Sequence, residues 1–203
     1  MRPARIRLCL VLSGLLASIG SADEQGDRPP FPERIVITHQ EAEEDDPVEF
    51  ALQRNGIGLC EWGLLRIDLY RAALYLEKPT KCDREVVDSN QAKHIRLHFV
   101  RGLTRKQMRR AYGAAFRANV GDETDRYEKR IEQFIRLIPQ VKNGDLLAFT
   151  CVPGHGLEIQ HADKRLGRIP GDDFAALFIR LYVGPKPPTE DLKRGLLGLA
   201  EDD

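Results

Sequence analysis

Residues 94–120 have the sequence HIRLHFVRGLTRKQMRRAYGAAFRANV, and this stretch decides the fold class. Polar and apolar residues alternate over 94–99, which predicts a β-strand over 94–100 with one apolar face and one polar face. Thr104 and Gln107 then form a capping box, which predicts that a helix begins after Thr104. A half-buried strand followed by an amphipathic helix favours a sheet that helices cover on one face.

The segments on both sides extend this pattern. Strands are predicted at 34–38, 48–53, 59–62, 64–76, 146–152, 157–161 and 165–169. Small turns are predicted at 55–58 (NGIG) and 153–156 (PGHG). Helices are predicted from 122 or 124 to 138, at 171–183 and at 189–197. The predicted fold class is therefore α+β, with a mostly antiparallel sheet and a layer of helices.

Length and composition narrow the possible functions. A chain of 203 residues suits one domain. The chain carries 31 Lys and Arg against 31 Asp and Glu, so its charge gives no general case for binding nucleic acid or an anionic membrane. No apolar run reaches 18 residues, which excludes a multi-pass membrane protein.

The first 22 residues have the pattern of a secretory signal peptide. Arg2, Arg5 and Arg7 precede a short apolar stretch, and small residues precede an expected cleavage after Ala22. We therefore expect an exported protein, periplasmic in a Gram-negative cell and otherwise secreted, with no membrane span after cleavage. Cleavage removes three arginines and no acid, which leaves 28 basic residues against 31 acidic ones.

The rest of the chain divides into three parts. Residues 23–47 form a Pro-rich and acidic arm that includes the run EAEEDD at 41–46, which we interpret as a solvated loop. Residues 48–198 form the domain, and 199–203 are a C-terminal tail. Three cysteines remain after cleavage, so at most one internal disulfide is possible, and its pairing stays open: Cys60, Cys82 and Cys151.

Motifs for catalysis, metals and cofactors are not found. The chain has no GxSxG, HExxH, Walker or dinucleotide-binding pattern, and no CxxC or Cys/His metal spacing. His94 and His98 lie roughly 13 Å apart on one strand face, so we interpret them as exposed strand residues rather than metal ligands. His155 is interpreted as a turn residue. No metal and no cofactor are expected.

Four segments together resemble the chalcone isomerase-like family, specifically its exported bacterial branch. They are NGIGLCEWGLLRIDLYRAALYLE (55–77), HIRLHFVRGLTRKQMRRAYGAAFRANV (94–120), GDLLAFTCVPGHGLEIQ (144–160) and RIPGDDFAALFIRLYVGPKPPTEDLKRGLLG (168–198). The resemblance runs from about Val48 to Gly198. It implies an open-faced β-sandwich, in which a large antiparallel sheet carries a helical layer. It also implies a cleft between sheet and helices that holds a flavonoid in plant enzymes and a fatty acid in non-catalytic relatives.

The resemblance also indicates where a ligand would bind. Plant enzymes carry a catalytic Arg after a G-x-G-x stretch, and this chain has Cys60 in that place, which cannot supply a fixed positive charge. Arg105 and Tyr112 fall near two further polar positions of the plant site, and Leu181 falls near a hydroxyl position. Charge could be supplied instead by one of three arginines. The ligand-binding candidates are therefore Cys60, Arg66, Arg105, Arg109 and Tyr112, and no catalytic residue is assigned.

Three functions remain open. The first is non-catalytic binding of a small apolar ligand, such as a fatty acid, in the cleft, because an apolar cleft with few polar anchors suits such ligands. The second is an active intramolecular lyase of the chalcone isomerase type, which rests on fold alone. The third is an interaction or structural protein that uses the acidic arm or an exposed sheet edge, with an unknown partner. Loss of the Arg favours the first.

Overall fold

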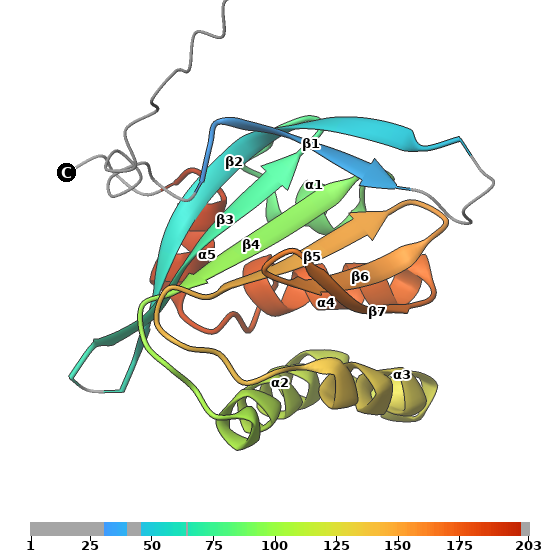
Figure 1. Ribbon diagram of the computed structural model, residues 1–203. Coiled ribbons are helices and arrows are strands. Elements are labelled where there is room, and N and C mark those ends of the chain that lie inside the picture. Colours follow the sequence, from blue (N-terminus) through green and yellow to red (C-terminus); the bar gives the residue numbers. More distant parts are fainter. Residues whose placement is uncertain (1–30, 40–45, 64, 200–203) are drawn as a thin grey trace, which may run out of the picture.

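The computed structural model describes residues 31–39, 46–63 and 65–199, and the expected signal peptide and most of the acidic run lie outside these residues. Its centre is one sheet of seven antiparallel strands in sequence order (Figure 1). The strands are β1 (Arg34–His39), β2 (Val48–Trp62), β3 (Ile67–Leu76), β4 (Lys93–Phe99), β5 (Leu146–Val152), β6 (Gly156–His161) and β7 (Lys164–Ile169). The predicted α+β class is confirmed.

Helices cover one face of this sheet, which we call the helix face (Figure 1). They are α1 (Asp83–Asp88), α2 (Arg105–Val120), α3 (Thr124–Leu137), α4 (Asp172–Val183) and α5 (Glu190–Leu196), with a single 3₁₀ turn at Gly121–Glu123 before α3. The Thr104 capping box is present, and Thr189 caps α5 through its hydroxyl. Helix α1 was not predicted, because six residues are too few to show a 3.6-residue period.

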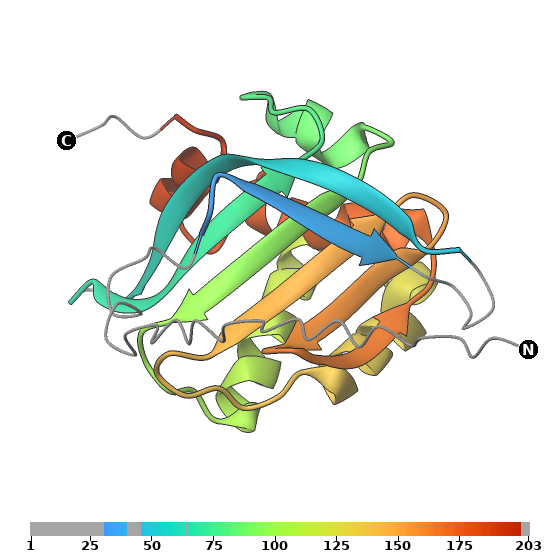
Figure 2. The same cartoon turned by 45° about the horizontal axis from the view of Figure 1, so that its top comes forward.

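Strand alternation assigns each face its side chains. On β4, Ile95, Leu97 and Phe99 are buried in the large core beneath the helices, as predicted. The opposite face, which we call the outer face, has a smaller apolar cluster around Phe31, Leu52 and the ring of Tyr75. This second cluster forms because the sheet curls, so that β1 lies across the outer face (Figure 2).

The prediction of a turn at 55–58 is wrong, since these residues lie inside the 15-residue strand β2. The glycines mark a close approach of α5 rather than a turn. A Cβ on Gly56 would lie 2.1 Å from the carbonyl oxygen of Gly195, and one on Gly58 would lie 2.5 Å from that of Leu192. Only glycine therefore allows the backbones of β2 and α5 to touch.

Candidate functional site

The space between the sheet and helices α2, α3 and α4 is occupied by a layer of aromatic side chains. Phe149 on β5 contacts Phe178 on α4, with ring centroids 4.5 Å apart, and Phe134 on α3 stacks against Phe149 at 6.0 Å. Phe116 on α2 lies 5.2 Å from Phe134. These rings are completely buried, so the region where the resemblance places a ligand is an apolar, closely packed layer.

Four polar side chains lie together against this layer, and we call them the inner polar cluster: Cys60, Tyr70, Tyr112 and Tyr182. The hydroxyls of Tyr112 on α2 and Tyr182 on α4 form a hydrogen bond of 2.9 Å. The hydroxyl of Tyr70 on β3 forms a hydrogen bond with the Cys60 thiol on β2. Two helices and two strands therefore bring their hydrogen-bonding groups to one place inside the protein.

All four members of the inner polar cluster are neutral. Burial raises the pKa of the Cys60 thiol, although the Tyr70 hydroxyl partly offsets this effect. Burial also raises the pKa values of Tyr70, Tyr112 and Tyr182 above the ordinary tyrosine value. The cluster therefore presents a thiol and hydroxyl groups, with no fixed charge, to anything that binds between the sheet and the helices.

The sequence candidates separate in the structure. Cys60 and Tyr112 lie together in the inner polar cluster, whereas Arg66 is exposed at the β2–β3 turn and pairs with Glu61 at 2.6 Å. Arg105 is exposed at the start of α2, and Arg109 donates a long hydrogen bond of 3.4 Å to the carbonyl of Arg136. Among the described residues, none of these three arginines has a hydrogen bond or ion pair with the inner polar cluster.

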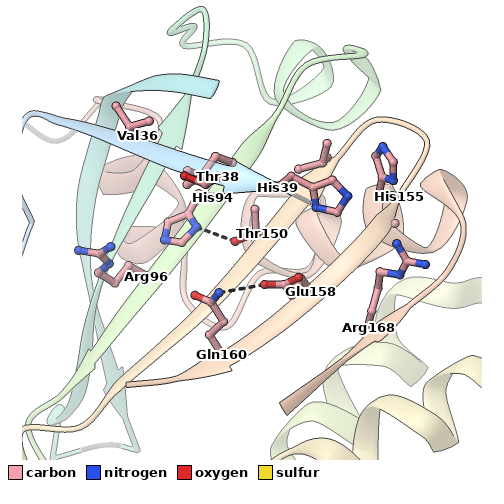
Figure 3. A pocket seen from close by; sticks show the side chains of 13 residues that line it. Val36, Thr38, His39, His94, Arg96, Thr150, His155, Glu158, Gln160 and Arg168 are labelled. Carbon is pink, nitrogen blue, oxygen red and sulfur yellow. Dashed lines mark hydrogen bonds between the residues drawn. The ribbon is translucent and has the colours of Figure 1, made fainter. Parts of the chain in front are cut away.

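A hollow of about 240 Å³ lies on the outer face, between β1 and the strands β4 to β7 (Figure 3). We call it the outer pocket. A row of cross-strand neighbours, one from each of four strands, lines the pocket. From β4 to β7 these residues are His94, Thr150, Glu158 and Arg168. Arg96 and Gln160 lie in the next row, while His39 and His155 approach each other at the rim, with ring centroids 4.1 Å apart.

The prediction that His94 is an exposed strand residue is wrong. Its side chain is 2% exposed, because β1 and its apolar neighbours close over this part of the outer face. Its Nδ1 atom lies 2.9 Å from the Thr150 hydroxyl, and its buried Nε2 atom has no hydrogen-bond partner in the segments that the structure describes. Burial, assisted by the positive charge of Arg96, lowers the pKa of His94 to about 3, so the imidazole is neutral.

A second hollow, of about 310 Å³, opens where α1 and α4 meet the ends of β4 and β5. The buried Lys93 amine lies there and donates hydrogen bonds to the carbonyls of Val87 and Ser89. Burial raises the pKa of the neighbouring Cys151 thiol to about 12. The cysteines of the described segments are all free, and these segments contain no group of three side chains that could hold a metal ion.

The curled antiparallel sheet with helices on one face is an open-faced β-sandwich. A protein-family model described as chalcone isomerase-like matches residues 42–198, and the chain belongs to this family. The solved structure of a fatty-acid binding protein from Arabidopsis thaliana is similar, with a TM-score of 0.58 and 16% sequence identity, and the match covers 79% of this chain and 96% of that chain. At this identity the similarity shows a shared fold. No curated protein matches the chain. No helix among the described segments is both long and apolar enough to cross a membrane.

Sequence reasoning missed the outer pocket. Strand alternation did place His94 and Arg96 on the polar face of their strand, and the same alternation places Thr150, Glu158 and Gln160 on one face of theirs. The missing information was the register of the strands and the curl that brings β1 over them. Both follow from long-range packing that one strand's sequence does not contain.

Proposed function

We propose that this protein is a non-catalytic binding protein for a small apolar ligand, such as a fatty acid, held between the sheet and the helices. The observation that carries the proposal is the inner polar cluster, a group of neutral hydrogen-bonding side chains packed against an aromatic layer. An apolar site with a few convergent polar groups is the usual environment for such ligands. The similar structure from Arabidopsis thaliana is that of a fatty-acid binding protein, which supports the same assignment.

The chemistry of the cluster argues against catalysis of ring closure. Stabilising the oxyanions of that reaction needs a preorganised positive charge or several strong donors. Cys60 occupies the position where the resemblance expects the arginine, and its thiol is neutral because burial raises its pKa. Two of the arginines considered as a source of charge form their hydrogen bonds and ion pairs elsewhere, Arg66 with Glu61 and Arg109 with the Arg136 carbonyl.

The packing of the aromatic layer determines how a ligand would enter. The contacts of Phe149 with Phe178 and Phe134 leave the rings touching, so an alkyl chain has to replace ring–ring contacts with chain–ring contacts. Such an exchange requires side chains to change rotamer and the layer to open, because a closely packed interior does not take up additional atoms without strain. The head group of the ligand would then lie against the hydroxyls of Tyr112 and Tyr182.

The test is to measure ligands on the mature chain, residues 23–203. Native mass spectrometry of protein purified from its own host, followed by organic extraction, should find a bound acyl chain or another apolar acid. Added fatty acids should raise the melting temperature, since a ligand that binds only the folded state stabilises it. Tyr112→Phe should reduce the rise, whereas Arg66→Gln, at the exposed hairpin, should leave it unchanged. An empty protein with no thermal shift would overturn the proposal and favour an interaction role.

Export remains part of the proposal. Residues 1–22 have the charge and apolar pattern of a signal peptide. N-terminal sequencing of the protein from its host should begin at Asp23. Detection of Met1 in the protein from the cell envelope or medium would contradict cleavage.

A further inference from the structure

We propose that the outer pocket is a second binding site, separate from the space between sheet and helices, and that it takes the carboxylate group of a small organic acid. The proposal rests on three observations: an arginine without a hydrogen bond or ion pair to the described residues, a buried imidazole nitrogen without a partner among these residues, and a hollow of suitable size between them and β1 (Figure 3).

Arg96 provides the positive charge. Its guanidinium forms no hydrogen bond or ion pair with any of the residues that the structure describes, although it is half-buried on the outer face. Its direct neighbours across the strands are Ala73 on β3 and Ala148 on β5, so small side chains flank it on both sides. An arginine in such a place can bind a carboxylate through two parallel hydrogen bonds.

His94 provides a second donor on the same face of β4. Residues two apart on a strand lie roughly 7 Å from each other, which is a distance that one small ligand can bridge. The His94 ring lies between Arg96 and Thr150 (Figure 3). When the Thr150 hydroxyl donates to Nδ1, the neutral ring carries its proton on Nε2, and this buried atom has no partner among the residues that the structure describes. A ligand oxygen would satisfy it, which removes the cost of a buried unpaired donor.

The Tyr75 hydroxyl extends the same row on the third strand. Tyr75 is paired with His94 across β3 and β4, and their rings meet edge-on at 6.0 Å. In the described part of the chain, the buried Tyr75 hydroxyl has no hydrogen-bond partner. Two adjacent buried polar atoms without partners are unusual, since native proteins satisfy most such groups. His94 lines the pocket, so a small movement of its ring would bring Nε2 to a ligand oxygen there, and the Tyr75 hydroxyl is the next group along the row.

Charge and size decide the class of ligand. The carboxylate of Glu158 would oppose an anion, but it is paired with Arg165 at 3.0 Å and accepts a hydrogen bond from Gln160 at 2.9 Å. A volume of about 240 Å³ lies just below the range of roughly 300–1,000 Å³ that drug-sized ligands occupy, so the ligand is small. A metal ion is a poorer occupant, because the described residues contain no set of three suitable ligands.

The experiment is an NMR titration of the mature chain with butyrate and benzoate, using butyramide and benzamide as neutral controls of the same shape. Butyrate and benzoate should cause saturable shifts of the backbone N–H resonances in β4 and β5. Butyramide and benzamide should not cause these shifts. Arg96→Gln should weaken binding about tenfold or more, as expected for loss of a bidentate charged pair. Thr150→Val removes the hydroxyl that holds His94 in one tautomer, and it should weaken binding of the acids less than Arg96→Gln does. Arg71→Gln is the matched control, because Arg71 lies on the same sheet face outside the pocket.

Three results would overturn the proposal. The first is that the neutral amides bind as tightly as the acids. The second is that Arg71→Gln weakens binding of the acids as much as Arg96→Gln does. The third is that the shifts map to α2 and α4 instead of β4 and β5. Inorganic phosphate serves as a further arm, and tighter binding of phosphate than of butyrate would exclude the carboxylate assignment. Melting curves of each variant confirm that it is folded, and Thr150→Val replaces Arg96→Gln as the decisive variant if the latter does not fold.

Discussion

Replacing Gly56 with Ala tests the contact between β2 and α5. The added Cβ would lie 2.1 Å from the carbonyl oxygen of Gly195, against 3.4 Å for an ordinary contact, so the helix would have to move by about 1.3 Å. The backbone nitrogen of Gly198 and the carbonyl oxygen of Leu196 are also within 2.7 Å of that position. These are backbone atoms, so no side chain can rotate away to relieve the clash.

The movement disturbs more than one contact. The Asn55 side chain donates a 2.8 Å hydrogen bond to the Leu196 carbonyl, and Leu192 and Leu196 are both fully buried beneath the sheet. Overpacking a well-packed interior costs about 1–3 kcal/mol, and a helix displaced with its buried side chains belongs at the upper end. We expect Gly56→Ala to lower the free energy of unfolding by about 3 kcal/mol.

Gly113→Ala is the matched control, since Gly113 lies within α2 and its Cβ would meet only the flexible end of Arg117 at 3.4 Å. An alanine in a helix interior stabilises by about 1 kcal/mol relative to glycine. Guanidinium unfolding followed by circular dichroism should therefore separate the two variants by about 4 kcal/mol, with opposite signs relative to the parent. Equal stability of Gly56→Ala and the parent would refute the close approach of α5 to β2.

Three further predictions concern buried polar groups and a helix cap. Tyr112→Phe should lower the free energy of unfolding by about 1–3 kcal/mol, because it leaves the Tyr182 hydroxyl unpaired. In denaturant unfolding, the double change Tyr112→Phe with Tyr182→Phe should lower it by less than the sum of the two single changes. The pKa of His94 is about 3 in the folded protein and 6.5 in the unfolded chain, so as the pH falls the unfolded chain takes up this proton before the folded protein does. Stability should fall as the pH drops from about 6.5 towards 3, and His94→Gln should show a flatter pH profile, whereas an unchanged profile would contradict neutral burial. Thr104→Ala removes the cap of α2 and should lower the free energy of unfolding, measured by thermal unfolding, by about 1 kcal/mol. An unchanged free energy of unfolding would show that the capping box does not stabilise the helix.

Several elements of the fold were predictable because local chemistry specifies them. The Thr104 capping box, the Thr189 cap and the alternation of β4 each depend on residues within a few positions of one another. The turn at 55–58 was wrongly predicted because glycine has two uses. It permits turns, and it also permits two backbones to touch, and only α5, about 140 residues further along the chain, shows which use applies.

The candidate site was predictable in part. Cys60 and Tyr112 come together in the inner polar cluster, but their partners Tyr70 and Tyr182 carried no signal, since a tyrosine in an apolar stripe resembles any other core aromatic. Arg66 and Arg105 are exposed because of how the β2–β3 turn and the start of α2 are oriented. This orientation depends on the tertiary structure and cannot be read from the residue types.

The sequence by itself determined the α+β class, the starts of α2, α4 and α5, and which side chains of β4 share a face, because these depend on short-range periodicity and hydrogen bonding. The tertiary structure alone decided which faces meet. The curl of the sheet buries His94 beneath β1, and the strand register aligns it with Thr150 and Glu158. Register and curl result from packing summed over all seven strands, and a one-residue slip would move every side chain to the other face, so no single segment contains that information.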